Sequence, residues 1–229
     1  MTLTRSFALA ALAALALAAP AAAQQTFSDE TIHQARLFFQ ANASSSNRKD
    51  CITTVNHAIR EIFYRGRQLP RLGSRMDLTY DALARGGQAT GPRFIDFVDA
   101  AGRKTTGATA PQRLGASVFD AAVALTGGVP GWHVVGLSIM DGYHSVTLVV
   151  DTRRPGQPYI NYADQWFGGG WKAFGRGDGL DAQLEQFTRS WYEGYMASHG
   201  GVRPRTRITL WRLRPPGEAT RGIAGRLGG

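Results

Sequence analysis

The fold class is indicated by the stretch HVVGLSIMDGYHSVTLVVD, residues 133–151. Its two halves are dominated by β-branched and other apolar residues, a composition typical of strands. Between them stands Asp141-Gly142, a pair that favours a hairpin turn. The stretch therefore predicts two antiparallel strands, over 133–139 and 143–151.

The chain after this hairpin continues the sheet. We expect a turn over 152–156, a third strand over 158–164, a long helix over 180–197 and a last strand over 205–213. The long helix interrupts the strands once, so the sheet is predicted to be antiparallel with one inserted helix.

The chain before the hairpin has the apolar spacing of helices. We predict helices over 28–42, 51–65, 78–85, 92–101 and 116–126. Asp50 stands where the N-cap of the second helix belongs, which places Cys51 in its first turn. The order of elements predicts an α+β fold, with N-terminal helices packed on a C-terminal antiparallel sheet.

Length and composition indicate one globular domain. The chain has 229 residues, a formal net charge of +9 and a single cysteine, which excludes an intrachain disulfide framework. We assign the domain to residues 24–213. Residues 214–229 are rich in Arg, Gly and Pro and are expected to form a flexible tail.

Residues 1–23 have the pattern of a secretory signal peptide. A positively charged start containing Arg5 is followed by an apolar run and by small residues ending at Ala23. No later segment reaches the ~20 consecutive apolar residues of a membrane span. We therefore expect a protein without a transmembrane span that works in the periplasm or outside the cell after cleavage.

Cys51 is the candidate nucleophile. A thiol becomes reactive when a base stands beside it, and the first turn of a helix favours the thiolate through its dipole. His144, at the start of a predicted strand, is the candidate base, and His133 is its rival because it also lies in a strand.

Strand parity selects a third polar group to orient the base. If 143–151 and 158–164 pair across a turn at 152–156, His144 lies opposite Asp164. Asn161 then points to the other face, so Asp164 is favoured. Asn161 remains the alternative if the register slips by one residue, and Gln165 if a bulge intervenes.

A Cys that opens a helix (Asp50-Cys51-Ile52), a His that opens a strand (Tyr143-His144-Ser145) and a polar residue on the next strand resemble the papain-like thiol hydrolases. Within that superfamily the chain is most similar to bacterial cell-wall amidases of the NlpC/P60 type and related secreted amidase effectors. The resemblance implies a papain-like arrangement of helices and sheet, and a peptide or peptidoglycan substrate. By analogy, the Cys51 backbone N–H and a donor such as Asn47 would stabilise the oxyanion.

Aromatic residues near the predicted site are candidate substrate contacts. The loop beginning at Gln165-Trp166, together with Trp132 and Tyr143, either lines a cleft beside Asp164 or packs on the sheet edge.

Several partner classes are excluded or favoured by the same sequence. The chain lacks CxxC and HExxH motifs and a phosphate-binding loop, so we expect no metal and no cofactor. The C-terminal residues from Arg203 contain seven arginines and one acid, which favours contact with anionic polymers or lipid head groups. The signal peptide argues against nucleic acid as a partner.

These patterns predict a secreted or periplasmic cysteine amidohydrolase that uses Cys51, His144 and Asp164. Peptidoglycan peptides are the predicted substrate. Two alternatives stay open: a non-catalytic binding or adaptor domain in which Cys51 is structural, and an amine acyltransferase with the same three residues. An inhibitor protein is a further candidate partner.

Overall fold

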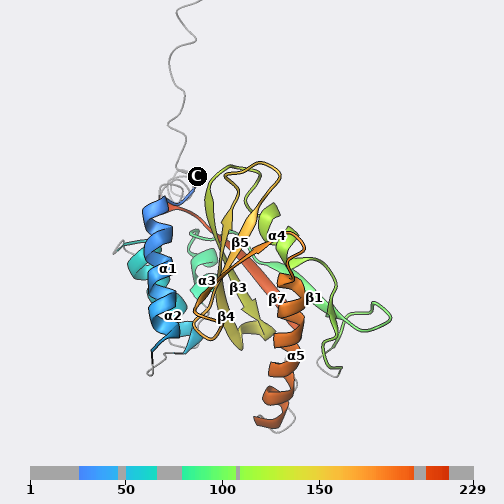
Figure 1. Ribbon diagram of the computed structural model, residues 1–229. Helices are drawn as coiled ribbons and strands as arrows, with labels where there is room; N and C mark the ends of the chain where they lie inside the picture. The colour runs from blue at the N-terminus through green and yellow to red at the C-terminus, as the bar shows by residue number, and fades with distance from the viewer. Residues whose placement is uncertain (1–25, 46–49, 66–78, 107–108, 199–204, 217–229) are drawn as a thin grey trace, which may run out of the picture.

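The computed structural model describes residues 26–45, 50–65, 79–106, 109–198 and 205–216 (Figure 1). The predicted signal peptide, Asn47 and most of the predicted tail lie outside these residues. The helical elements are α1 (Asp29–Ala43), α2 (Cys51–His57), η1 (Ala58–Phe63), α3 (Thr79–Arg85), α4 (Val118–Ala124), η2 (Met140–Gly142) and α5 (Leu180–Ser198). The strands are β1 (Arg93–Val98), β2 (Arg113–Leu114), β3 (Trp132–Ile139), β4 (His144–Asp151), β5 (Tyr159–Ala163), β6 (Trp171–Gly175) and β7 (Arg207–Leu213).

The predicted hairpin forms the centre of the sheet. β3 and β4 pair antiparallel from Trp132↔Asp151 to Ile139↔His144, and the turn between them contains the short η2 helix. The described strands form one antiparallel sheet of seven, in the order β2-β1-β7-β3-β4-β5-β6. The last strand of the chain, β7, is therefore inserted between β1 and β3.

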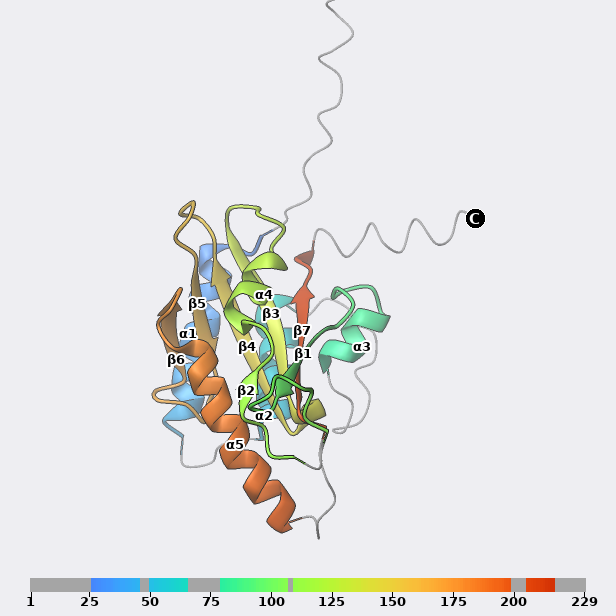
Figure 2. The same ribbon diagram turned by 90° about the vertical axis from the view of Figure 1, so that its right-hand side faces the viewer.

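Helices cover both faces of this sheet. One face packs against α1, α2, η1 and α3, and the other packs against α4 and α5. Figure 2 shows α4 and α5 on the near side of the sheet, with α1 and α2 behind it. Strands with both faces covered read as nearly continuous apolar runs, which explains the composition of β3 and β4.

The α+β class predicted from the sequence is confirmed, but the order of its parts differs. The helix predicted over 92–101 is wrong, because this segment is strand β1. Its Ile95 and Phe97 alternate with more exposed residues, and the strand pairs with β7. β2 and β6 were not predicted. Since β1 and β2 precede α4, the sheet is not purely C-terminal.

The helix predicted over 51–65 is present with a change of winding. It begins at Cys51 as α2 and continues as η1, a π-helix in which the Tyr64 backbone N–H donates to the Ile59 carbonyl at 3.0 Å. The buried face of this helical segment contains Val55 and Ile59, in agreement with the predicted apolar spacing.

The start of the predicted C-terminal tail belongs to the fold. The Arg214 backbone N–H donates to the Gln88 carbonyl at 2.8 Å, and the Tyr64 hydroxyl donates to the Arg214 carbonyl at 2.8 Å. Arg207 and Arg212 of the arginine-rich region lie in β7. The arginines at 203, 221 and 226 fall outside the described residues.

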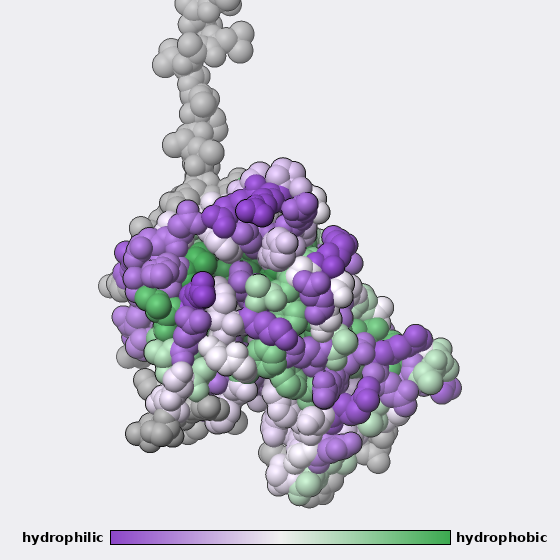
Figure 3. All heavy atoms as spheres, viewed as in Figure 1, coloured by the Kyte–Doolittle hydropathy of each residue, from purple (hydrophilic) through white to green (hydrophobic). Residues whose placement is uncertain are grey.

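On the face seen in Figure 1, hydrophobic side chains reach the surface between α1 and α5, surrounded by hydrophilic ones (Figure 3). No helix in the described ranges has both the length and the apolar character that crossing a membrane requires.

Candidate active site

Cys51 is the first residue of α2, and the cap in front of it fixes this position. The Asp50 carboxylate accepts hydrogen bonds from the Thr53 backbone N–H at 2.8 Å and from the Thr53 hydroxyl at 3.0 Å. This is the N-cap predicted from the sequence, and it starts the helix at the cysteine. The Cys51 side chain is a free thiol and is partly exposed.

His144 and Asp164 form a buried pair at the end of the sheet. The imidazole Nε2 and the Asp164 Oδ2 are 2.7 Å apart, and the two residues are 5% and 3% exposed. His144 is the first residue of β4, and Asp164 follows the last residue of β5. The pairing of these two residues, predicted from strand parity, is present.

The predicted register between these strands is wrong by two residues. Leu148 pairs with Tyr162 rather than with Ile160, because the strands are joined by a longer connection than the predicted turn at 152–156. A shift of two residues keeps every side chain on its predicted face, since the side-chain period of a strand is two. His144 and Asp164 therefore lie on the same face of the sheet, but they are offset along the strands instead of directly opposite each other.

Both oxygens of the Asp164 carboxylate are held. Oδ2 also accepts a hydrogen bond from the Tyr162 hydroxyl at 3.3 Å, and Oδ1 accepts one from the Trp166 backbone N–H at 3.0 Å. Burial, followed by the charge of Asp164, raises the pKa of Tyr162 well above its ordinary value, so its hydroxyl remains a donor. These contacts fix the orientation of the carboxylate beside the imidazole.

His144 is strongly basic. Burial lowers its pKa, but the charge and hydrogen bond of Asp164, together with the hydrogen bond and charge of Cys51, outweigh burial and raise the pKa to about 9. His144 is therefore protonated at neutral pH.

The hydrogen bonds assign a role to each nitrogen of the ring. An ionised carboxylate can only accept, so the proton on Nε2 points to Asp164. Nδ1 does not face Asp164 and is left to exchange a proton with Cys51, whose side chain interacts with this ring. The structure thus brings Cys51, His144 and Asp164 together, with the imidazole between the thiol and the carboxylate.

Two contacts at this site were not anticipated from the sequence. The indole of Trp191, in α5, lies 4.3 Å from the His144 ring, centroid to centroid. The Thr54 hydroxyl donates to the Gln165 side-chain oxygen and thereby ties α2 to the turn after β5. Trp191 lies in the helix predicted over 180–197, but no local pattern could show which strand that helix would meet.

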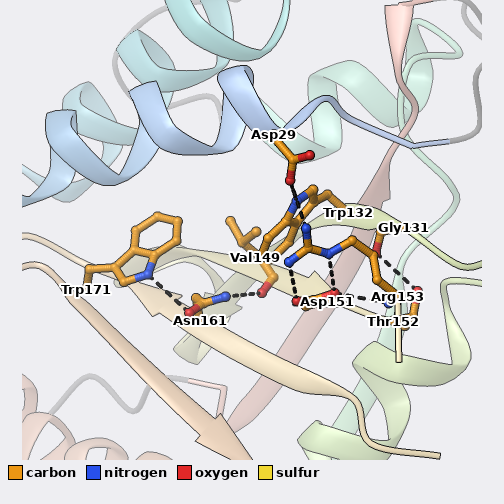
Figure 4. Close-up of polar contacts among 9 residues, drawn as sticks. All are labelled: Asp29, Gly131, Trp132, Val149, Asp151, Thr152, Arg153, Asn161 and Trp171. Carbon is orange, nitrogen blue, oxygen red and sulfur yellow. Dashed lines mark hydrogen bonds and ion pairs between the residues drawn. The ribbon is translucent and has the colours of Figure 1, made fainter. Parts of the chain in front are cut away.

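Trp132 is not brought to this site. It pairs with Asp151 at the opposite end of the β3–β4 hairpin, where the Arg153 guanidinium lies 4.1 Å above its ring (Figure 4). Arg153 also donates to Asp29 at 2.9 Å, which anchors the start of α1. Trp132 is therefore part of a structural cluster rather than a cleft wall beside Asp164.

Asn161 is likewise excluded as the orienting group. Its side-chain oxygen accepts from the Trp171 indole at 3.1 Å, and its amide donates to the Val149 carbonyl at 3.3 Å (Figure 4). His133, the rival base, pairs with Val150 and contacts the Val129 carbonyl at 2.8 Å. It lies at the far end of β3 from His144.

The remaining predicted contacts have three different outcomes. Tyr143 and Trp166 are 40% and 52% exposed; Tyr143 directly precedes His144 and Trp166 follows Asp164 by two residues, so both flank the site. Gln165 is buried and contacts Thr54. Asn47 lies outside the described residues.

Among the residues that the structure describes, no group of three His, Cys, Asp or Glu side chains is arranged to hold a metal ion. Comparison of the chain with protein-family models, with curated proteins and with solved structures finds no match.

Proposed function

We propose that this protein is a cysteine amidohydrolase in which Cys51 is the nucleophile, His144 the proton carrier and Asp164 the orienting group. The observation that carries the proposal is the buried imidazole, which contacts a partly exposed thiol on one side and a fixed carboxylate, 2.7 Å away, on the other. The resemblance of the sequence to papain-like thiol hydrolases supports this proposal. We propose with it that the helices and the sheet have the papain-like arrangement.

The reaction uses the proton held by His144. The Cys51 thiolate attacks the amide carbonyl, and the imidazolium of His144 gives its Nδ1 proton to the leaving amine. This leaves a thioester on Cys51 and a neutral imidazole. Water then attacks the thioester while His144 takes its proton, and the carboxylic acid product leaves with Cys51 restored.

Asp164 supports both steps without receiving a proton. Its carboxylate holds the Nε2–H tautomer, so Nδ1 always faces the sulfur, and its charge stabilises the imidazolium. The raised pKa of His144, about 9, keeps the proton available to the leaving amine at neutral pH.

The developing oxyanion needs a donor, and the start of α2 offers one. The Cys51 backbone N–H occupies the first helical position, where an amide has no partner within the helix. A donor at this point is next to the carbon that the sulfur attacks, which is where negative charge develops.

We propose peptide amides of the bacterial cell wall as the substrate, with action in the periplasm or outside the cell. The signal-peptide pattern of residues 1–23 and the net charge of +9 support this choice. In this proposal the arginine-rich C-terminal region contacts an anionic polymer near the substrate.

Purified peptidoglycan incubated with the protein, followed by mass analysis of the fragments, tests the proposal. Wild type should release new peptide fragments, whereas Cys51→Ala and His144→Ala should each lower the rate by at least about a thousandfold. His57→Ala is the matched control, because His57 is an exposed histidine on the same helix as Cys51. Unchanged cleavage in the Cys51 variant would overturn the mechanism.

A further inference from the structure

A row of buried hydroxyl side chains crosses the sheet beside the candidate site. Ser145 follows His144 in β4 and pairs with Ser138 in β3, which in turn pairs with Thr209 in β7. Directly paired residues in a sheet point to the same face. The row therefore lies on the face that carries α2 and α3, where its neighbours are otherwise mostly apolar.

Two hydroxyls of this row are without partners among the described residues. The Ser138 and Ser145 hydroxyls are fully buried and accept or donate no hydrogen bond there. The indole N–H of Trp211, two residues after Thr209 on the same face, is also buried and, within the same ranges, unpaired. Buried polar groups almost always have a partner, so these groups can bond to a water molecule or to a ligand that reaches them.

A cavity of about 280 Å³ lies at the far end of this row. Ser138, Thr209 and Trp211 line it, together with Phe94, Asp81 and Arg207. Its size is just below the range of pockets that hold drug-sized molecules, and it suits one amino-acid residue.

The position of the cavity relates it to Cys51. Neighbouring strands lie about 4.8 Å apart, so Thr209 is about 10 Å from Ser145, measured across β3. An extended peptide advances about 3.3 Å per residue. A substrate that extends from Cys51 toward β7 over this distance, outside the buried row, would place its second or third residue at the cavity.

The unpaired groups define the chemistry of what the cavity binds. An indole N–H can only donate, and a serine hydroxyl can also donate, so the ligand must present a hydrogen-bond acceptor. Asp81 and Arg207 contribute opposite charges to the lining, which favours a ligand group without net charge.

We propose that this cavity is a specificity pocket for a carboxamide-bearing residue of the substrate, held by hydrogen bonds from Ser138 and Trp211. Its role in specificity rests on the proposed amidohydrolase function, whereas binding itself does not. The pocket would select substrates by a group two or three residues from the bond that is cut.

Binding can be measured without turnover in the full chain carrying Cys51→Ala. N-acetylglutamine amide is titrated while the indole N–H resonance of Trp211 is followed by NMR, with the resonance assigned through Trp211→Phe. We expect a saturable shift of this resonance, and at least a fivefold weaker affinity in the Ser138→Ala background. Absence of a saturable shift would overturn the pocket.

Two analogues test the chemical class of the ligand. N-acetylnorleucine amide keeps the main-chain amides and lacks the side-chain carboxamide, and N-acetylglutamate amide carries a charge in its place. Both should bind at least fivefold more weakly than the glutamine compound. Equal binding of all three, or tighter binding of the glutamate compound, would contradict the assignment of a carboxamide.

Thermal unfolding distinguishes a binding role from a structural one. Ser138→Ala should leave the melting temperature unchanged or raise it, because the hydroxyl has no partner in the described ranges. Thr126→Val is the control that should lower it, since the Thr126 hydroxyl donates to the Val123 carbonyl at 2.8 Å. A drop in the Ser138 variant equal to that of the control would show a structural hydroxyl and overturn the proposal.

The outcomes separate this pocket from the proposed function. A shift of the Trp211 resonance without any hydrolysis by wild type would support the binding pocket and refute the proposed amidohydrolase function. Hydrolysis without any shift would refute only the pocket.

Discussion

The charge state of His144 depends on one carboxylate. Asp164 lies 2.7 Å from the imidazole, and its other contacts, with the Tyr162 hydroxyl and the Trp166 backbone, prevent it from turning away. The Trp191 ring covers the imidazole at 4.3 Å. A histidine so enclosed would normally be neutral, and only the acid beside it and the thiol keep it protonated.

The stability of the protein should depend on pH through this histidine. Its pKa of about 9 in the folded state lies above the ordinary unfolded value of about 6.5. The stabilisation is therefore complete below about pH 6.5 and is lost as the pH rises through about 9, by an amount on the order of 3 kcal/mol. Urea unfolding of wild type across this range should show the decline.

Asp164→Asn is the comparison for this measurement. The amide keeps the shape of the side chain but removes the charge that raises the pKa of His144. The decline of stability between about pH 6.5 and about pH 9 should then largely disappear. An identical decline in both proteins would show that Asp164 does not control the histidine.

The packing of α3 on β3 depends on a glycine in the middle of the strand. A Cβ at Gly136 would lie 2.2 Å from carbon atoms of the Tyr80 ring. The Tyr80 hydroxyl crosses to β4 and donates to the Val146 carbonyl at 2.8 Å. Glycine usually weakens a strand, but here it allows one ring from α3 to lie across β3 and reach β4.

Gly136→Ala should therefore destabilise the protein by about 1 to 3 kcal/mol, because the new methyl group overlaps the Tyr80 ring. The free energy of unfolding in urea measures the effect. Gly194→Ala in α5 is the matched control: nothing lies within 4 Å of its Cβ position, so alanine should stabilise the helix by about 0.5 to 1 kcal/mol.

A double variant locates the cause of the Gly136 effect. In a Tyr80→Ala background the methyl group has room, so Gly136→Ala should lose most of its destabilising effect. An unchanged effect in that background would mean that Tyr80 is not the reason for the glycine.

At the scale of the whole molecule, the candidate site is assembled from three layers. Cys51 comes from the helices on one face, His144 and Asp164 from the sheet, and Trp191 from the helix on the other face (Figure 1). The central strands β7, β3 and β4 have neighbours on both edges and helices on both faces. The site therefore depends on the integrity of the central sheet.

Hydrogen exchange should follow this organisation. Amides of β3 and β4 should be the most protected in the molecule, because their hydrogen bonds open only with the global unfolding of the sheet. Amides of β6 and of β2, at the two edges, should exchange faster. Mass spectrometry of peptic fragments after exchange in heavy water measures the difference, and equal protection at edge and centre would contradict it.

Features that local rules control could be predicted directly from the amino-acid sequence. The Asp50 cap fixes the helix start at Cys51, the hairpin around Asp141-Gly142 fixes the pairing of β3 with β4, and strand parity puts His144 and Asp164 on one face. Caps, turns and side-chain periods act over a few residues, so they can be read directly from the chain. The predicted face of each side chain remained correct despite the two-residue error in register, because the face depends only on whether a position is odd or even.

Features that depend on contacts between distant segments became evident only in the folded protein. The sequence predicts a helix over 92–101, whereas the short alternation around Ile95 and Phe97 forms a strand that pairs with β7. The Trp191 ring over His144 and the alignment of Ser138 with Thr209 likewise join segments far apart in sequence. Such contacts are selected by the burial of apolar surface over the whole domain, which leaves no local period in the sequence.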